Sequence, residues 1–476
     1  MKKLSERYLV FAILSALLAT FIIVIFNTQN SFGGADNYGH FKLAFWGWKY
    51  PDMLFDHWGK PLFTILISPF AQFGFNGARI YNVLMGLFTA FLIWKIAKYF
   101  NFNQAWIVVL LVVFMPVYFT LMFTSLTEVT FSFFITLAIL LFFKKRYIWS
   151  AVIFSLLPFS RTEGVVLMPL FILAFLLKRK YSALPFLLTG FLVFSLAGWP
   201  FHESFWWLIT DMPYHGSAKD IYGTGTLFHF IHQSPNIFGL LPGIFFILGI
   251  FVMSYKWVRK DRFKTDDVFY FLLLVIASFL VFFAAHSYAW WKGIGNSLGL
   301  IRVIGSVTPL AALTAMAGVS TLYDITKKQW RIVISVLLVV AFGFFINDTV
   351  QRDKRYFHAS QPQQLMNEVA DYLKNNKLDR FQIVYYDPYL AFKLFLDPRD
   401  QAKTRNRLST RENFLNVIPD SSIIVWDAHF GPNEGRMHLE RLEKQKELKK
   451  LKVFKPEKSF KVVGGYEYQI VIFQKQ

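Results

Sequence analysis

Long apolar runs recur along most of this chain, and they constrain its fold more than any other feature. A helix of about 20 apolar residues crosses the hydrocarbon core of a bilayer, and a sheltered helix needs fewer. The sequence therefore predicts an all-α polytopic membrane protein with about 11 transmembrane helices. The runs are Tyr8–Phe26, Ile80–Tyr99, Trp106–Phe123, Leu126–Phe143, Ile148–Phe159, Val165–Leu177, Ala183–Trp199, Ile237–Tyr255, Val268–Ala285, Leu298–Val319 and Ile332–Ile346.

Three stretches need separate interpretation. The runs Ile148–Phe159 and Val165–Leu177 are short, so we expect them to be tilted or buried by neighbours. No small-residue cleavage site follows Tyr8–Phe26, which indicates an uncleaved anchor rather than a secretory signal. Pro61–Phe70 is too short to span and is typical of an amphipathic or re-entrant segment at the interface.

The composition agrees with a membrane protein and excludes several other classes. Hydrophobic residues make up 55% of the 476, more than one soluble core of this size buries. The net charge of +20 does not indicate nucleic-acid binding, because the basic residues form short clusters between apolar runs. The absence of cysteine excludes disulfides and thiolate metal sites.

The basic clusters also predict the orientation. They fall in every second connection, at residues 95–98, 144–146, 178–180, 256–264 and 327–331. Since basic loops stay on the cytoplasmic side, the N-terminus is predicted to be cytoplasmic and the C-terminus extracytoplasmic. We therefore expect a multi-pass protein of a bacterial inner (plasma) membrane, with large outward loops at 27–79 and 200–236.

The composition becomes polar near residue 347, so we expect a transmembrane domain over 1–346 and a small extracytoplasmic α/β domain over 347–476. Asp387 and Asp427 each follow a predicted strand, where α/β folds place ligand sites. Both are also ordinary turn formers, which is the simpler interpretation. The predicted elements are helices Gln361–Asn376 and Glu434–Lys450 and strands Gln382–Tyr386, Ser422–Trp426 and Gly465–Phe473.

Three carboxylates in the outward connections are candidates for function. Asp36 follows Gly33-Gly34 just past the first run; on its own it resembles a turn or helix cap as much as a functional carboxylate. Glu128 and Glu163 each stand three residues after a serine at the start of an apolar run. This S-x-x-E spacing is typical of a capping box, in which both side chains satisfy backbone groups.

Cations near the membrane boundary suggest an anion site. Arg161 lies between two short spans, and Arg302 is expected four residues into the apolar helix beginning at Leu298. Charge at that depth indicates a functional site, with snorkelling as the alternative, and a guanidinium suits a phosphate. Lys292 is a third such cation. The fourth outward loop adds His202, Glu203 and His215, whose spacing is unspecific for a metal.

With these motifs in view, the chain resembles the GT-C superfamily of membrane glycosyltransferases, which use polyprenyl-phosphate sugar donors, and in particular its mannosyltransferase-like members. The resemblance covers the whole length. It rests on a long loop carrying Asp36 after the first span and on Thr127-Glu128 opening another. It rests also on Ser160-Arg-Thr-Glu-Gly-Val-Val-Leu-Met-Pro169 and on Gly299-Leu-Ile-Arg302-Val-Ile-Gly-Ser-Val-Thr-Pro309.

The resemblance implies a hexosyl transfer, with inversion, from a polyprenyl-phosphate donor to a glycan, glycolipid or protein acceptor at the outer membrane face. It implies Asp36 as the general base and Arg302, with Arg161 or Lys292, as the holder of the donor phosphate. Further substrate contacts are expected from Tyr38, Glu128, Glu163, His202 and Glu203. It requires no nucleotide cofactor, and the sequence indicates no divalent metal. The partners are membrane lipids, donor and acceptor, and no nucleic acid.

Two departures from the family pattern stand out, and two other functions stay open. Asn37 follows Asp36 where many members carry a second acidic residue. In Trp290-Trp291-Lys292-Gly293 a lysine replaces the aspartate of the similar oligosaccharyltransferase motif, so protein N-glycosylation is not predicted. A transporter or flippase of lipid-linked saccharides would show inverted halves with charges near mid-membrane. A non-catalytic polysaccharide assembly protein would tolerate changes at Asp36 and Arg302.

Overall fold

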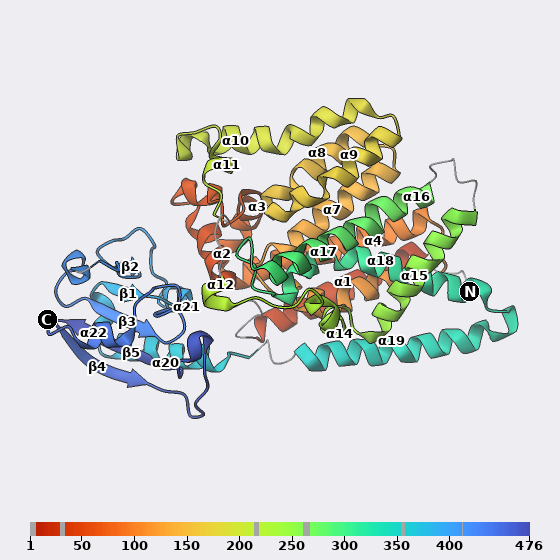
Figure 1. Ribbon diagram of the computed structural model, residues 1–476. Helices are drawn as coiled ribbons and strands as arrows, with labels where there is room; N and C mark the ends of the chain where they lie inside the picture. Colours follow the sequence, from red (N-terminus) through yellow and green to blue (C-terminus); the bar gives the residue numbers. More distant parts are fainter. Residues whose placement is uncertain (1–5, 29–33, 214–218, 260–266, 354–357, 412) are drawn as a thin grey trace. The chain divides into compact units, whose positions relative to one another are not determined.

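The computed structural model describes residues 6–28, 34–213, 219–259, 267–353, 358–411 and 413–476. They form two compact units (Figure 1). The first unit comprises the described residues of Met1–Gly33, Leu43–Lys219 and Gly223–Phe357. The second comprises the described residues of Gly34–Lys42, Asp220–Tyr222 and His358–Gln476.

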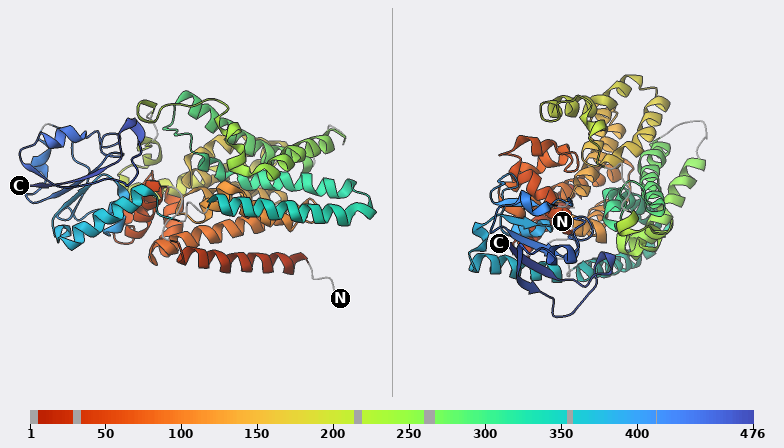
Figure 2. Two further views of the ribbon diagram at one scale, coloured as in Figure 1. Left: turned by 90° about the horizontal axis from the view of Figure 1, so that it is seen from below. Right: turned by 60° about the vertical axis from the view of Figure 1, so that its left-hand side comes forward.

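The first unit is a bundle of helices whose long members run roughly alongside one another (Figure 2). Within the described ranges, 6 helices are long and apolar enough to cross a membrane. These are α1 (Glu6–Phe26), α4 (Gly74–Tyr99), η4–α10 (Tyr181–Leu188 and Thr189–His202), α15 (Leu240–Arg259), α16–η5–α17 (Asp267–Phe271, Leu272–Ile276 and Ala277–Lys292) and η7–α19 (Lys328–Trp330 and Arg331–Asp353).

Shorter helices complete the bundle and include the two short spans predicted above. The apolar ones are α3 (Pro61–Ala71), α5 (Ile107–Phe114), α6 (Pro116–Met122), α7 (Glu128–Phe143), α8–η2 (Tyr147–Ser155 and Leu157–Phe159), η3–α9 (Thr162–Leu167 and Met168–Leu177) and η6–α18 (Ile301–Ser306 and Thr308–Ile325). The connections hold η1 (Pro51–Phe55), α2 (Gly34–Trp46), α11 (Trp207–Thr210), α12 (Lys219–Tyr222), α13 (His229–His232) and α14 (Ser234–Phe238). The basic loop 256–264 lies partly outside the described residues.

Two of the predicted helices are broken, and in both a proline marks the break. The run Trp106–Phe123 divides into α5 and α6 because Pro116 supplies no backbone donor, and Met115 before it is extended, with ψ 124°. The run Leu298–Val319 does not start as an α-helix. Pro309 stands in the first turn of α18, and Arg302 lies ahead of it in the 3₁₀ segment η6.

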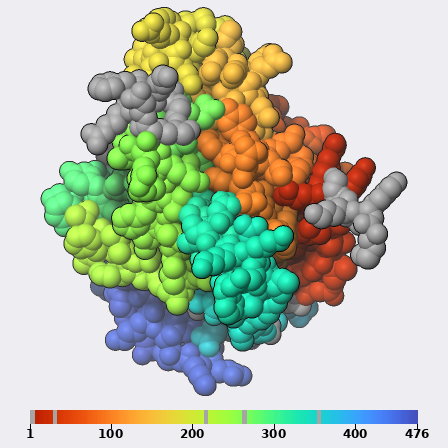
Figure 3. Space-filling model, turned by 90° about the vertical axis from the view of Figure 1, so that its right-hand side faces the viewer, coloured from red at the N-terminus to blue at the C-terminus, as the bar shows by residue number. Residues whose placement is uncertain are grey.

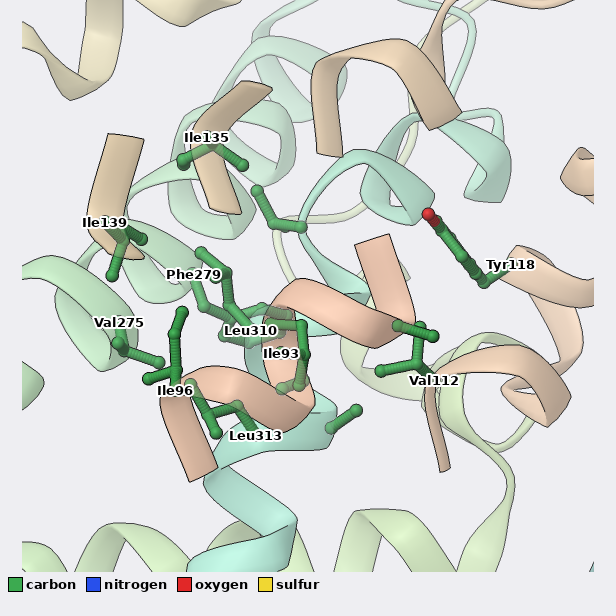
Figure 4. Close-up of a cluster of buried hydrophobic side chains, with 14 of the residues drawn as sticks. Ile93, Ile96, Val112, Tyr118, Ile135, Ile139, Val275, Phe279, Leu310 and Leu313 are labelled. Atoms are coloured by element: carbon green, nitrogen blue, oxygen red, sulfur yellow. The ribbon is translucent and has the colours of Figure 1, made fainter. Parts of the chain in front are cut away.

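The core of the first unit is formed by aliphatic and aromatic side chains from helices distant in sequence. Figure 4 shows α4, α5, α7 and α18 meeting there through Ile93, Ile96, Val112, Ile135, Ile139, Leu310 and Leu313, all with 0% exposure. Figure 3 shows one face on which the segments around α4, α15 and α19 lie side by side.

A buried arginine ties two helix ends together inside this bundle. Arg79 of α4 is 1% exposed. Its Nε donates to the Phe123 carbonyl at 3.0 Å and its Nη1 to the Ile25 carbonyl at 3.1 Å, so it satisfies carbonyls at the C-terminal ends of α6 and α1. Asn82, one turn on, donates to the Thr124 and Leu126 carbonyls at 2.8 Å. These bonds fix the turn that leads into Glu128.

The second unit contains a five-stranded sheet of order β2-β1-β3-β5-β4, with β1, β2 and β3 parallel and β5 antiparallel to β3 and β4. The predicted α/β character and the two buried strands are confirmed. The elements are α20 (Gln361–Asn375), η9 (Leu378–Arg380), β1 (Ile383–Tyr385), α21 (Pro388–Lys393), β2 (Thr404–Asn406), η10 (Phe414–Val417), β3 (Ile423–Asp427), α22 (Leu439–Glu443), β4 (Leu448–Phe454), η11 (Val463–Gly465) and β5 (Ile470–Lys475).

The predicted helix Glu434–Lys450 is wrong. Only α22 is helical, and the chain then enters the edge strand β4. The lysines that suggested a solvated helix surface, Lys449, Lys450 and Lys452, are exposed along this strand. Lysine is common on edge strands because it discourages pairing with another chain, and charge alone does not separate the two structures.

Candidate functional site

Charged side chains from four separate segments meet in the first unit. Glu128 is the first residue of α7, and Arg161 lies between η2 and η3. Arg161 Nη1 is 2.8 Å from Glu128 Oε1, and Arg161 Nη2 is 2.8 Å from Glu163 Oε1. Arg161 also donates to the Thr127 hydroxyl at 3.1 Å. The arginine thus links the start of α7 to η3, and two of the carboxylates predicted from the sequence are brought together by one of the predicted cations.

Glu128 is the most enclosed member of this cluster. Its side chain is 2% exposed, and its Oε1 also lies 3.8 Å from Arg302 Nε. Its other oxygen, Oε2, is buried without a hydrogen-bond partner among the described residues. An unpartnered buried carboxylate oxygen is costly, and a hydroxyl brought in by a ligand would satisfy it.

The capping-box interpretation of both glutamates is wrong. The Ser160 hydroxyl donates to the Leu157 carbonyl at 2.9 Å, and neither α7 nor η3 has a side-chain cap bond. Both carboxylates pair with Arg161 instead. The buried ion pairs outweigh the backbone caps because an enclosed guanidinium requires its counter-charges nearby. A capping box does form in the second unit, between Ser360 and Gln363 at the start of α20.

Two cluster residues were not predicted from the sequence. His286 of α17 places Nε2 3.7 Å from Glu163 Oε1, with its side chain 11% exposed. Lys60, directly before α3, is 6% exposed and donates to the His57 carbonyl at 3.0 Å and to the Thr162 hydroxyl at 2.9 Å. The boundary-charge rule that selected Arg161 also applies to Trp58-Gly59-Lys60-Pro61, so Lys60 was within reach of sequence reasoning.

Lys60 has an unusual backbone conformation and a lowered pKa. Its φ of 66° is unusual for a residue with a side chain, and such backbone strain gathers at functional sites. Burial lowers the pKa of Lys60 to about 8, with Glu163 opposing and Arg161 adding to the shift. Three cations, Lys60, Arg161 and Arg302, therefore lie near Glu128 and Glu163, and Asp56 adds a further negative charge near Lys60.

An apolar cavity opens beside Lys60. Its volume is about 260 Å³, and its lining combines Lys60 with largely apolar residues from the helices around η2, η3 and η4. Such a cavity accommodates an amphipathic molecule with an anionic head and an apolar body. The lining residues are His57, Lys60, Pro61, Ser155, Pro158, Phe159, Thr162, Val165, Met168, Leu187, Leu188, Phe191, Leu208, Ile209 and Met212.

His202, a predicted substrate contact, joins two segments near this cavity. Its Nδ1 lies 2.8 Å from Asp211 Oδ2 and its Nε2 3.1 Å from the Phe55 carbonyl. The ring stacks on buried Trp207 at a centroid distance of 4.1 Å. Because both nitrogens face acceptors, both hydrogen bonds form only when the ring carries two protons. Glu203, with φ 56°, ends α10 in the left-handed conformation.

Replacement of His202 by alanine is expected to loosen the loop that carries Lys60. The change removes two hydrogen bonds and a stacked ring, so we expect a loss of roughly 1–3 kcal/mol in stability. Amide exchange of residues 55–60 in the intact protein measures this loosening. His232→Ala, at an exposed histidine of the same loop region, is the control. Equal exchange in both variants would contradict the expectation.

The remaining predicted site residues belong to other parts of the chain. Lys292 is exposed, with its ammonium 3.7 Å from the centre of the Trp291 ring. Asp36 and Tyr38 belong to the part of α2 that falls in the second unit. His215 lies outside the described residues. Across the described ranges, no group of three or more histidine and carboxylate side chains has a metal-binding arrangement.

In the second unit, the aspartates at the strand ends act as caps, but they are also buried close together. Asp387 accepts from the Tyr389 amide, and Asp427 accepts from the amides of His429 and Phe430. They stand two residues beyond the paired residues Tyr385 and Val425 of adjacent parallel strands. Burial raises the pKa of both, and for Asp427 the charge of Asp387 raises it further.

This pair should make the second unit less stable as the pH rises. The folded state holds protons that the unfolded chain releases near pH ~4, so stability falls from there up to the raised pKa of Asp427. Asp427→Asn removes the charge, keeps the accepting oxygen and should flatten this dependence by on the order of 1–3 kcal/mol. The measurement is amide exchange of β3 in the intact protein, corrected for intrinsic rates. Asp420→Asn, at a carboxylate that is 77% exposed, is the control and should change the pH dependence of stability little. An unchanged pH dependence in Asp427→Asn would contradict the prediction.

Comparison with known proteins identifies solved structures that have a similar fold. No protein-family model matches the chain, and no curated protein matches it in sequence at a significant level. Two solved structures of ArnT from Cupriavidus metallidurans are similar in structure. The form bound to undecaprenyl phosphate is 11% identical with a TM-score of 0.62, over 98% of this chain and 97% of that one. The apo form is 11% identical with a TM-score of 0.63, over 97% of this chain and 98% of that one. The chain therefore has the ArnT-like GT-C fold expected from its motifs.

Proposed function

We propose that this protein, with its ArnT-like fold, is a membrane glycosyltransferase that transfers a sugar from a polyprenyl-phosphate donor. The observation that carries the proposal is the cluster of buried cations and carboxylates beside an apolar cavity, with Lys60 among the residues that line it. One of the similar ArnT structures is bound to undecaprenyl phosphate, a molecule with the same combination of phosphate head and apolar chain. A hexose of the mannose type, inversion and the outer membrane face belong to the same proposal, on the motifs and the basic loops.

Each cluster residue has a part in the proposed reaction. Lys60 and Arg302 bind the donor phosphate, where negative charge grows as the bond between the anomeric carbon and the phosphate oxygen breaks. Arg161 is already held by Glu128 and Glu163, so it orients the carboxylates as well as adding charge. The free Oε2 of Glu128 accepts a hydrogen bond from a sugar hydroxyl.

The acceptor side of the reaction is assigned to Asp36. A hydroxyl oxygen of the acceptor attacks the anomeric carbon, and the proton of that hydroxyl passes to the Asp36 carboxylate. The polyprenyl phosphate leaves with the electrons of the broken bond. General-base catalysis of this kind contributes about 10²–10⁴-fold. The acceptor is a glycan, a glycolipid or a protein.

A transporter of lipid-linked saccharides is less well supported. Charged side chains of the described bundle gather near helix ends such as the start of α7, rather than at the middle of a broken helix pair. A non-catalytic assembly protein would have no need for a strained lysine at an apolar cavity, or for a buried carboxylate oxygen without a partner among the described residues.

The proposal is tested by following a radiolabelled sugar from polyprenyl-phosphate hexoses to acceptor or water, with purified protein in lipid nanodiscs. We expect turnover by the wild type and a loss of at least about 10²-fold in Arg302→Ala. Lys292→Ala tests whether the loss is specific to Arg302. The Lys292 ammonium lies over the Trp291 ring, and we expect near-normal turnover without it. If no hexose donor reacts or binds, the enzymatic proposal fails, and flux of the lipid across liposomes is the next assay.

A further inference from the structure

The C-terminal domain, which is residues His358–Gln476 of the second unit, holds the segment of α2 that carries Asp36. Residues Gly34–Lys42 belong to the second unit together with His358–Gln476, although more than 300 residues separate them in sequence. Tyr38 of this segment is 2% exposed. Its ring lies 4.8 Å from that of Tyr389 and 4.7 Å from that of Phe392, both in α21.

Further contacts fix both the rotation and the position of this segment. The Gln363 side chain in α20 donates to the Tyr38 hydroxyl at 3.0 Å, and the Phe41 ring packs edge-on against Phe392 at 5.7 Å. Tyr38 and Phe41 are three residues apart, so they lie on one face of the helix. Asp36 is placed two residues before Tyr38, and its direction is therefore set by how that face is docked.

A second contact of the domain lies near Asp36. The Tyr222 hydroxyl donates to Glu434 Oε1 at 2.8 Å, and Glu434 Oε2 pairs with Arg407 Nη2 at 2.6 Å. Burial raises the pKa of Tyr222, and the negative charges of Glu434 and Asp36 raise it further, which places Asp36 within electrostatic reach of this chain of contacts.

We propose that the C-terminal domain is a positioning part of the transferase: α20 and α21 hold the Asp36 segment through Tyr38 and Phe41, so that the carboxylate keeps the orientation its proton transfer requires. This inference rests on the proposed function. Tyr38 and Phe392 are positioning residues in it. A small misplacement of a reacting group costs up to about 10²-fold in rate, so the aromatic contact has a measurable consequence.

The test uses the intact protein and four variants. Phe392→Ala removes the ring shared by Tyr38 and Phe41, and Tyr38→Phe keeps the packing but loses the hydroxyl. Tyr372→Ala removes a ring of the same domain that packs on Phe454 of β4. Asp36→Asn provides the background for a double-mutant comparison. The measurements are kcat, donor KM, and amide exchange of residues 34–42.

We expect Phe392→Ala to raise exchange over 34–42 and to lower kcat at least about tenfold with little change in donor KM. Tyr38→Phe keeps the ring and should lower kcat less than Phe392→Ala does, and Tyr372→Ala should match the wild type. In the Asp36→Asn background, Phe392→Ala should cost little more, because a residue that acts through Asp36 has nothing left to position.

Wild-type kcat in Phe392→Ala would overturn the inference, and so would a full additional loss in the Asp36→Asn background. Unchanged exchange over 34–42 in an active Phe392→Ala protein would overturn it as well. Absence of transfer by the wild type is a different failure, because it would overturn the proposed function and, with it, this inference.

Discussion

Lys60→Met is expected to reduce kcat/KM for a polyprenyl-phosphate sugar by about 10²–10³-fold, the loss typical when one donor to a developing oxyanion is removed. The methionine side chain keeps most of the buried stem volume and removes the ammonium. The ammonium donates to the hydroxyl of Thr162, and both residues line the cavity, so its loss leaves the phosphate with fewer positive partners.

The pH profile gives an independent check on Lys60. Since burial lowers the pKa of Lys60 to about 8, the amine loses its charge above that pH, and kcat/KM of the wild type should decline there. The decline should be absent from the residual activity of Lys60→Met. Lys49→Met, at an exposed lysine of the same loop region, is the control. Wild-type donor affinity in Lys60→Met would show that the phosphate binds elsewhere.

Arg161→Met is expected to cost roughly 3–5 kcal/mol in stability, because it leaves Glu128 and Glu163 without their shared counter-charge. Glu128 is the critical partner: its side chain is 2% exposed, and the nearest other guanidinium atom, Arg302 Nε, is 3.8 Å away. Glu128→Gln in the Arg161→Met background should recover part of the loss, since a neutral amide is less costly to bury than a lone carboxylate.

Equilibrium unfolding in mixed micelles measures the stability of the wild type, Arg161→Met, Glu128→Gln and the double variant. Arg352→Met provides the matched control, because its partner Asp348 is 55% exposed, and exposed pairs contribute about 0–1 kcal/mol. A cost for Arg161→Met no larger than for Arg352→Met, or no recovery in the double variant, would mean that the cluster does not behave as a buried ion pair.

Apolar periodicity predicted most of the fold because membrane helices are specified by length and composition. Breaks were harder to predict: Pro116 and Pro309 stand inside uninterrupted apolar runs, and only the backbone shows that α6 and α18 begin there. In the second unit, buried apolar strands such as β1 and β3 were found, whereas the lysine-rich edge strand β4 has the charge pattern of a helix.

The candidate site was predicted in part. Arg161 and Arg302 were selected because charge at a membrane boundary is costly, and both lie in the cluster. The capping-box interpretation of Glu128 and Glu163 was wrong because local spacing cannot reveal a partner 33 residues away, as Arg161 is from Glu128. His286 carries no motif, so only the packing of α17 identifies it.

The order in which the cluster residues occur along the chain has a consequence for biogenesis. Glu128, at the start of α7, enters the membrane before Arg161 has been synthesised, and Arg302 follows after several more helices. An acidic helix end without its counter-ion is unfavourable in lipid. The α7 segment should therefore be retained by the insertion machinery until α8, η2 and then Arg161 have been synthesised, so that α7 and α8 are released into the bilayer together.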